Sequence, residues 1–384
     1  MVIIFSQIKG EKLTCDYFGK CGSCTLWDLT YNEQKDLKTK NSKILFDSFY
    51  AKDFLFFNSK DIHYRTRAEF IIWHDDEDIS YAMHGLNKKD IVKIDKCPKV
   101  CKNIYDLMPK LLEVIKGNET LKFKLFAVEF LSTKDEVLTT LLYHKKIDSS
   151  FEIEANKLEK KLNIKIIGRS KGIKKVTSDD FVHEDLHVKN PYTKSIKYKI
   201  YDTGFVQPNT FMNENMINFV IDELAKQQRD DLLELYCGHG NFTLPLSFYF
   251  NKVLATEISK TSIKAANENI SLNGIKNIFF ARLSASEFTQ AHEGNKEFKR
   301  LQNINLKEYN FSHILVDPPR AGLDEVSINL VKKFQNIIYI SCNQDSLRDD
   351  LAELCKTHKV IKFALFDQFP YTKHIESIAI LKSI

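Results

Sequence analysis

The sequence predicts an α/β protein, in which a doubly wound, mostly parallel sheet fills the C-terminal half and an α+β domain precedes it. Three observations support this fold class. Short apolar strands alternate with helical segments from about Met216 to the C-terminus, and the pattern changes near residue 200. The 384 residues are 43% hydrophobic and 12% aromatic, which is enough to fill packed cores and argues against disorder. We therefore predict a cysteine-containing segment at 1–58, an α+β domain at 59–205 and an α/β domain at 206–384.

The strands of the predicted α/β domain are short apolar runs separated by turns and helices. We place them at 231–236, 252–257, 278–282, 313–317 and 337–341, with a helix at 262–273. Segments 362–366 and 378–381 are expected to pair as a hairpin near the end of the chain. Strands that alternate with helices are typical of βαβ units, whose strands lie parallel in one sheet.

The region ahead of residue 205 combines strands and helices in a less regular order. We predict strands at 64–73, 126–131, 137–143 and 164–169, and helices at 29–50, 103–115 and 151–162. The acidic run at 75–78 is interpreted as a solvated turn. Strands paired with helices in this way indicate an α+β domain.

Charge is distributed unevenly along the chain. Residues 1–200 carry 36 Lys and Arg against 29 Asp and Glu, whereas the remaining residues carry 20 against 22. This asymmetry favours a polyanionic partner on the front half. No apolar run reaches the roughly 18 residues of a spanning helix, and residues 1–10 lack the features of a signal peptide. We expect a cytoplasmic enzyme, with no membrane contact and no obligate protein partner.

A glycine-containing turn follows the first strand of the α/β domain and predicts a cofactor site. In ELYCGHGNF (234–242), Gly238 and Gly240 allow the backbone to approach a ligand closely. The next strand ends in Glu257, where a carboxylate can accept hydrogen bonds from ribose hydroxyls. The third glycine of the dinucleotide fingerprint is missing, which disfavours NAD and favours S-adenosylmethionine. A capped turn beside an exposed glutamate is the alternative.

Two later strands deliver candidate reactive groups to the same edge of the sheet. Asp317 ends the strand in HILVDPPRAG, where two prolines stiffen the loop, and Cys342 follows the strand in YISCN. Carbon 5 of uracil becomes nucleophilic only after a thiolate adds to carbon 6, and a base must then remove the proton from carbon 5. Glu376 is a candidate for that base. The alternatives are a plain turn, a buried packing cysteine and a surface carboxylate.

Several longer motifs occur in an order that resembles the tRNA (uracil-5-)-methyltransferase family. They are QPN (207–209), LLELYCGHGNFTLPL, VLATEIS, LVDPPRAGLD, YISCN and FALFDQFPYTKHIES, preceded by similar segments at 63–76, 121–133 and 141–146. The resemblance therefore runs from about residue 60 to the end. It implies a Rossmann-like, S-adenosylmethionine-dependent methyltransferase domain preceded by an α+β RNA-binding domain.

The resemblance also implies roles for individual residues. Cys342 is implied as the nucleophile and Glu376 as the proton-removing base. The positions that match the family's S-adenosylmethionine site are Gln207, Tyr236, Asn241, Glu257 and Asp317. The front domain is expected to grip the T arm of tRNA, or of tmRNA, whose target uridine (position 54) is flipped out and becomes 5-methyluridine. The expected RNA contacts are Tyr64, Arg65, Arg67 and Phe126, although Phe126 could equally be a core residue.

The N-terminal cysteines depart from this pattern. Cys15, Cys21 and Cys24, with Cys97 before Pro98, resemble the four-cysteine iron–sulfur pattern of related ribosomal-RNA uracil methyltransferases. That resemblance implies a [4Fe–4S] cluster, or zinc, and Cys101 is a spare fourth ligand. It leaves ribosomal RNA open as the alternative substrate. The small β-barrel domain that usually precedes the cysteines in the ribosomal enzymes is not found ahead of Cys15, which favours tRNA.

Overall fold

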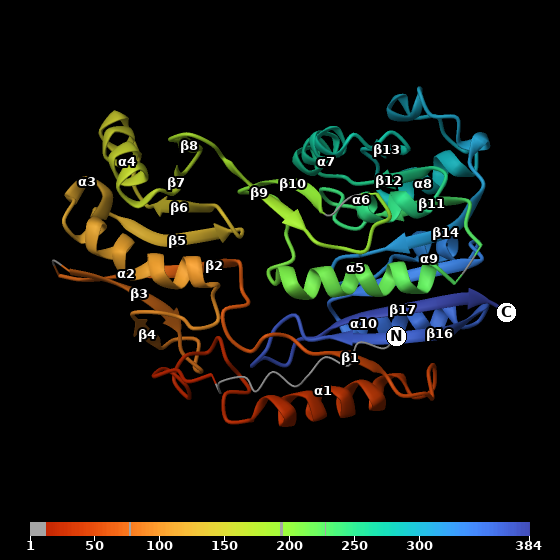
Figure 1. Ribbon diagram of the computed structural model, residues 1–384, viewed down its shortest axis with the longest axis horizontal. Helices are drawn as coiled ribbons and strands as arrows, with labels where there is room; N and C mark the ends of the chain where they lie inside the picture. Colours follow the sequence, from red (N-terminus) through yellow and green to blue (C-terminus); the bar gives the residue numbers. More distant parts are fainter. Residues whose placement is uncertain (1–12, 77, 193–194, 227) are drawn as a thin grey trace.

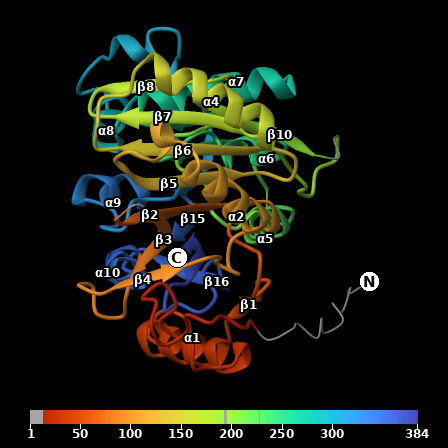
Figure 2. The same ribbon diagram turned by 90° about the vertical axis from the view of Figure 1, so that its left-hand side faces the viewer.

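The computed structural model describes residues 13–76, 78–192, 195–226 and 228–384. Two sheets, each with its own helices, lie side by side and are joined by a short two-stranded ribbon (Figure 1). Figure 2 views the molecule from the side of the smaller sheet, with helix α1 at the bottom. The predicted α/β class is confirmed. Residues 1–12 of the predicted segment 1–58 lie outside the described residues. The expectation that residues 1–10 carry no signal peptide therefore also lies outside them.

The larger sheet has eight strands in the order β1-β16-β17-β15-β14-β11-β12-β13. Strands β11 to β15 run parallel, and the β16–β17 hairpin adds antiparallel to β15, as the sequence predicts. Their bounds are β11 (Asp231–Leu235), β12 (Val253–Thr256), β13 (Ile278–Ala281), β14 (Phe311–Val316), β15 (Asn336–Ser341), β16 (His358–Phe366) and β17 (Glu376–Ser383).

Helices cover both faces of the eight-stranded sheet, which gives two apolar cores. One face carries α5 (Thr210–Leu224), α6 (Thr243–Leu246) and α7 (Lys260–Asn273). The other carries α8 (Ala285–His292), α9 (Glu325–Val331) and α10 (Gln344–Leu354). Short 3-10 turns occupy Ser247–Tyr249, Lys299–Leu301 and Leu306–Glu308. Both faces of the parallel strands are therefore buried, which explains their continuous apolar sequences.

The segment ahead of the front domain also packs on this sheet. Helix α1 (Tyr31–Phe46) begins at a capping box made by Thr30 and Glu33, two residues later than the predicted start. Strand β1 (Leu55–Phe57) pairs parallel with β16 at the edge of the sheet. Strand β1 thus completes the sheet that carries the methyltransferase-like motifs, although it lies far ahead of them in the sequence. The three-part domain division stays a prediction.

The smaller sheet has seven strands in the order β4-β3-β2-β5-β6-β7-β8, covered by α2 (Lys102–Lys116), α3 (Glu119–Lys122) and α4 (Ser149–Leu162). Its strands are β2 (Arg67–Asp75), β3 (Asp78–His84), β4 (Ile91–Ile94), β5 (Leu125–Ser132), β6 (Val137–Tyr143), β7 (Lys165–Ser170) and β8 (Ile173–Val176). The predicted acidic turn is the tight connection between β2 and β3, where Asp75 pairs with Asp78.

Strand β2 starts three residues later than predicted, because the backbone before it bonds to other segments. The amide of Arg65 donates to the Lys99 carbonyl, and the amide of Thr66 donates to the Pro208 carbonyl. The ribbon of β9 (Phe181–Leu186) and β10 (Ile196–Tyr201) connects the two sheets. Within the described residues, no helix is long and apolar enough to cross a membrane.

Candidate active site

The strand register brings three predicted cofactor residues to one edge of the eight-stranded sheet. The last residues of β11, β12 and β14 are paired with one another in the parallel ladder. Tyr236, Glu257 and Asp317 each follow directly, so all three leave the sheet at the same level. This carboxyl-end edge is where doubly wound sheets bind ligands.

Cys342 and Glu376 come from neighbouring antiparallel strands and meet at the same edge. Ser341, the last residue of β15, is paired with Ser377 of β17. The next pair outward is Cys342 and Glu376, because one strand ends where the other begins. Cys342 is half-buried, whereas Glu376 is buried. The antiparallel pairing of β15 with β17 therefore sets a thiol next to a carboxylic acid.

Burial and like charges raise the pKa values of these groups. Burial raises the pKa of Glu376 to about 8 and that of Asp317 to about 7. The pKa of the Cys342 thiol rises to about 11, first through burial and then through the nearby Glu376 and Asp317 carboxylates. Arg320 opposes the shifts of Cys342 and Glu376. Such a group of perturbed acids in a ligand-binding edge is typical of a reaction centre.

The glycine turn has the backbone conformation that a bound ligand requires. Glu257 accepts hydrogen bonds from the amides of Gly238 (3.1 Å) and Ser259 (2.7 Å), so backbone groups fix its carboxylate. Gly238 has φ +57° and open space where a Cβ would stand. Gly240 has φ +90°, and a Cβ there would lie 2.5 Å from Leu244 Cδ1. The turn thus needs glycine at both positions, and the backbone at Gly238 stays open to close approach.

The remaining predicted cofactor residues are held by partner amides. Gln207 Oε1 accepts from Gln368 Nε2 at 2.6 Å. Asn241 and Asn213 exchange reciprocal hydrogen bonds at 2.8 Å. These hydrogen bonds orient the side chains of Gln207 and Asn241. Neither partner, Gln368 nor Asn213, was singled out by the sequence analysis.

A further acidic residue below the edge was missed by sequence reasoning. Glu234 lies within β11, and burial raises its pKa to about 8, with Asp317 adding to the shift. Its Oε2 atom is buried without a hydrogen-bond partner among the described residues. An acidic side chain inside an otherwise apolar strand is the signal that could have identified it. Beside it, the Tyr236 hydroxyl lies 3.3 Å from Ser327 Oγ.

Three predicted RNA contacts lie at the start of β2, where the front domain meets the loop between β16 and β17. Tyr64 is buried, and its hydroxyl donates to the Pro370 carbonyl at 3.1 Å. The Arg67 guanidinium forms an ion pair with Glu129. Arg65 lies with its guanidinium 5.6 Å from the centre of the Phe369 ring. Of the three, Arg65 faces the cavity beside the active site.

Phe126 lies on the smaller sheet, in a groove of about 700 Å³. Its ring stacks on His144, with 3.9 Å between centroids and 17° between planes. Basic side chains line the same groove: Lys145, Lys146, Arg169 and Lys171. A stacked aromatic pair among cations suits unstacked bases and phosphates. The core alternative for Phe126 is thereby disfavoured.

The four predicted metal ligands line one cavity of about 340 Å³ between the front domain and the catalytic loops: Cys15, Cys21, Cys24 and Cys97. Burial raises the pKa of Cys24 to about 11, and the neighbouring Cys97 and Cys21 add to that shift. Among the described residues, however, no three His, Cys, Asp or Glu side chains are arranged to hold a metal ion. The thiols are gathered in one place but do not form a ligand set.

A doubly wound sheet whose edge combines a glycine turn with a backbone-held carboxylate has the fold and site of an enzyme that binds a nucleoside cofactor, the class that includes the S-adenosylmethionine-dependent methyltransferases. Within that class, the family described as tRNA (Uracil-5-)-methyltransferase matches residues 30–384. The chain belongs to this family, as the sequence motifs predict.

Similar proteins support this assignment over nearly the whole chain. The chain is 50% identical to a tRNA/tmRNA (uracil-C(5))-methyltransferase of Campylobacter concisus, covering 97% of this chain and 100% of the relative. It is 51% identical to the protein of that name from Sulfurovum, covering 95% and 98%. Among solved structures, it matches a Pyrococcus abyssi tRNA (uracil-54, C5)-methyltransferase in complex with S-adenosyl-L-homocysteine. That match has a TM-score of 0.71 at 20% identity, covers 94% and 85% of the two chains, and supports the fold.

Proposed function

We propose that the protein methylates carbon 5 of the T-loop uridine at position 54 of tRNA, forming 5-methyluridine through a covalent adduct between Cys342 and carbon 6. The observation that carries the proposal is the strand register that sets Cys342 opposite Glu376 at the cofactor edge. The names of the relatives support tRNA as substrate and add tmRNA as a second one. Since tRNA is cytoplasmic, the proposal includes a cytoplasmic location.

The methyl donor is S-adenosylmethionine, which supplies an electrophilic methyl group. We propose that five side chains hold it: Gln207, Tyr236, Asn241, Glu257 and Asp317. Glu257 is suited to the ribose hydroxyls, because two amides already orient its carboxylate. The space beside Gly238 supports close approach of the ligand to the backbone.

The chain's own groups then perform the bond changes on uracil. The Cys342 thiolate adds to carbon 6, and the electron pair of the 5,6 double bond moves into an enolate. Carbon 5 forms its bond to the methyl group while the sulfur–methyl bond of the donor breaks, which releases S-adenosylhomocysteine. The Glu376 carboxylate removes the proton from carbon 5, the carbon–sulfur bond breaks, and the double bond and thiolate are restored.

The RNA contacts that we propose lie on two surfaces. In this proposal Phe126, whose ring stacks on His144, holds a splayed base of the T loop in the basic groove. Arg65 faces the cavity beside the reaction centre and offers a cation to a phosphate. Tyr64 and Arg67 direct polar atoms to Pro370 and Glu129, so in our proposal they support this surface from within.

The experiment that tests the proposal uses a T-arm hairpin with 5-fluorouridine at the target position. Fluorine cannot leave as a proton, so the reaction should stall as a methylated covalent adduct. We expect wild type and Cys355→Ala, which alters a half-buried cysteine elsewhere in the domain, to form the adduct. Cys342→Ala should form none. If Cys342→Ala still forms it, the assigned nucleophile is wrong.

The cysteine-lined cavity supports a second proposal, a [4Fe–4S] cluster or zinc held by Cys15, Cys21, Cys24 and Cys97. The support is their convergence on one cavity, although the described arrangement is not a ligand set. Iron, sulfide and zinc analysis of anaerobically purified protein tests it, with Cys24→Ser against the control Cys355→Ser. Metal content that is absent, or equal in both variants, would rule it out.

These cysteines also keep ribosomal RNA as the second candidate substrate. The same trapping experiment with 5-fluorouridine in ribosomal-RNA fragments decides between the two. We expect an adduct on the T arm. An adduct on ribosomal fragments alone would assign the protein to the ribosomal branch.

A further inference from the structure

Helix α1 directs a mainly polar face towards the catalytic domain. Its buried residues are Gln34, Lys38, Ser42 and Phe46, which are spaced by four positions and therefore share one face. Lys38 is only 3% exposed, and Gln34 and Ser42 are fully buried. Buried polar groups cost free energy unless they are bonded, so the partners of these three residues are informative.

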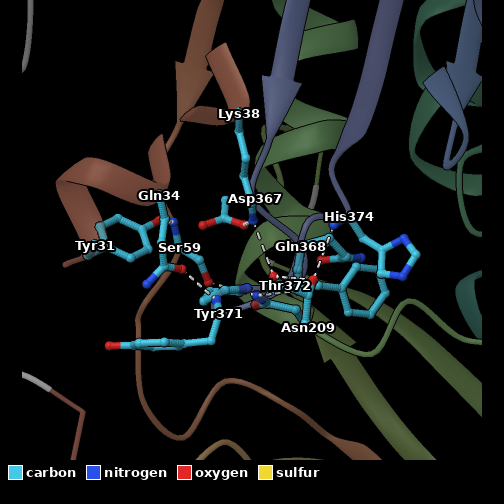
Figure 3. Close-up of polar contacts among 12 residues, drawn as sticks. Tyr31, Gln34, Lys38, Ser59, Asn209, Asp367, Gln368, Tyr371, Thr372 and His374 are labelled. Carbon is cyan, nitrogen blue, oxygen red and sulfur yellow. Dashed lines mark hydrogen bonds and ion pairs between the residues drawn. The ribbon is translucent and has the colours of Figure 1, made fainter. Parts of the chain in front are cut away.

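Two of the three polar residues hold the loop between β16 and β17. Lys38 Nζ donates to Asp367 Oδ1 at 2.6 Å and to the Phe369 carbonyl at 3.3 Å. Gln34 Oε1 accepts from the Tyr371 amide at 2.7 Å. Figure 3 shows these side chains of α1 directed at the loop. The loop leads directly into β17, which begins at the proposed base.

The third polar residue connects α1 to both strands of the reaction centre. Ser42 Oγ accepts from Gln344 Nε2 at 2.7 Å, and the same amide lies 3.2 Å from Ser377 Oγ. Gln344 is two residues beyond Cys342, and Ser377 directly follows Glu376. One amide thus links the helix to the segments that carry the thiol and the base.

The loop held by Lys38 also supports the cofactor site. Gln368, next to Asp367, donates to Gln207 Oε1 at 2.6 Å. Asn209 Nδ2 lies 3.4 Å from the Gln368 carbonyl and 2.8 Å from Ser59 Oγ. The contacts therefore run from α1 through the loop to Gln207, a proposed cofactor residue. Figure 3 shows the part of this network around Asp367, Gln368 and Asn209.

We infer that α1 positions the reaction centre, with Lys38 as its central positioning residue, and that this role is separate from any contribution to stability. The inference rests on the proposed function. Covalent addition and proton removal both require close alignment, and a misplacement of about 1 Å can cost roughly 100-fold in rate. Lys38 fixes two points of one loop, whereas Ser42 fixes the neighbouring segments.

A buried ion pair allows positioning to be separated from stability. Removing one partner leaves a buried charge, whereas replacing both partners with apolar residues is often neutral or stabilising. The decisive variant is therefore Lys38→Met/Asp367→Leu, with Lys40→Met on the exposed side of α1 as the control. We expect the double variant to keep the Tm of wild type and to lose about 10- to 100-fold in kcat. Its KM for tRNA should stay within about threefold of wild type.

If the double variant keeps both the Tm and the kcat of wild type, the inference is overturned, because the ion pair would then be structural only. If that variant fails to fold, Ser42→Ala decides. It should lower kcat about 3- to 10-fold at unchanged Tm, and an unchanged kcat would overturn the inference. Failure of wild type to trap fluorinated RNA would instead refute the proposed function, so the two failures are distinguishable.

Discussion

The edge of the catalytic sheet and the basic groove of the smaller sheet use charge in opposite ways. At the edge, acids are buried and their pKa values are raised, to about 8 for Glu376 and about 7 for Asp317. In the groove, Lys146 and Lys171 are exposed around the stacked pair of Phe126 and His144. In our proposal, bond chemistry at the edge depends on single groups held in place, whereas RNA binding in the groove is spread over several contacts.

Among the variants that test this difference between edge and groove, Glu376→Gln should have the largest effect. The variant lacks the base, so we expect turnover to fall by about 10²- to 10⁴-fold and the methylated Cys342 adduct to accumulate on ordinary uridine. Denaturing gels of the reaction with labelled T-arm RNA measure both effects. The control, Glu353→Gln, changes a surface acid on α10 and should behave as wild type. Normal turnover of Glu376→Gln would assign proton removal to another group.

The groove should respond differently to loss of its aromatic ring. Because stacking of a base on an aromatic side chain contributes about 1–3 kcal/mol, Phe126→Ala should raise the KM for tRNA by about 5- to 150-fold and leave kcat unchanged. Steady-state kinetics with intact tRNA provide the measurement. Phe279→Ala removes an exposed ring from β13 in the other domain and should have no effect. A fall in kcat at constant KM would contradict the binding role.

The sequence could predict the catalytic edge because its signals are local. Cys342 directly follows one strand with a clear apolar pattern and Glu376 begins another, and antiparallel pairing brings the end of the first beside the start of the second. The partners of α1 could not be predicted in this way. In the sequence alone, Lys38 is an ordinary lysine of a predicted helix. Its burial against Asp367 follows only from tertiary packing. Strands β3, β4 and β8 were missed for a similar reason, since pairing with neighbours defines them more than their composition does.

The pH dependence of the rate tests which groups at the sheet edge must lose a proton. Thiol addition and proton removal need deprotonated groups, and the pKa values of both Cys342 and Glu376 are raised. The rate should therefore rise about 100-fold per pH unit below about 8, where both groups are protonated, and about tenfold per unit between about 8 and 11. Arg320 lowers both pKa values, so Arg320→Gln should move this rise to higher pH by less than about one unit. A pH profile of kcat/KM measures the shift, and a shift to lower pH would contradict the assignment.

The smallest effect is expected from single cations of the groove. Each phosphate contact changes the slope of log affinity against log salt by about 0.7 for single-stranded RNA. Lys146→Gln or Lys171→Gln should therefore reduce the salt dependence of tRNA binding by about that amount, without changing kcat. Lys356→Gln, two residues beyond the end of α10, is the control. Lys145 should contribute less to binding, because it donates to the Thr120 carbonyl at 2.7 Å. A loss of kcat from either exposed lysine would show that groove and edge are coupled.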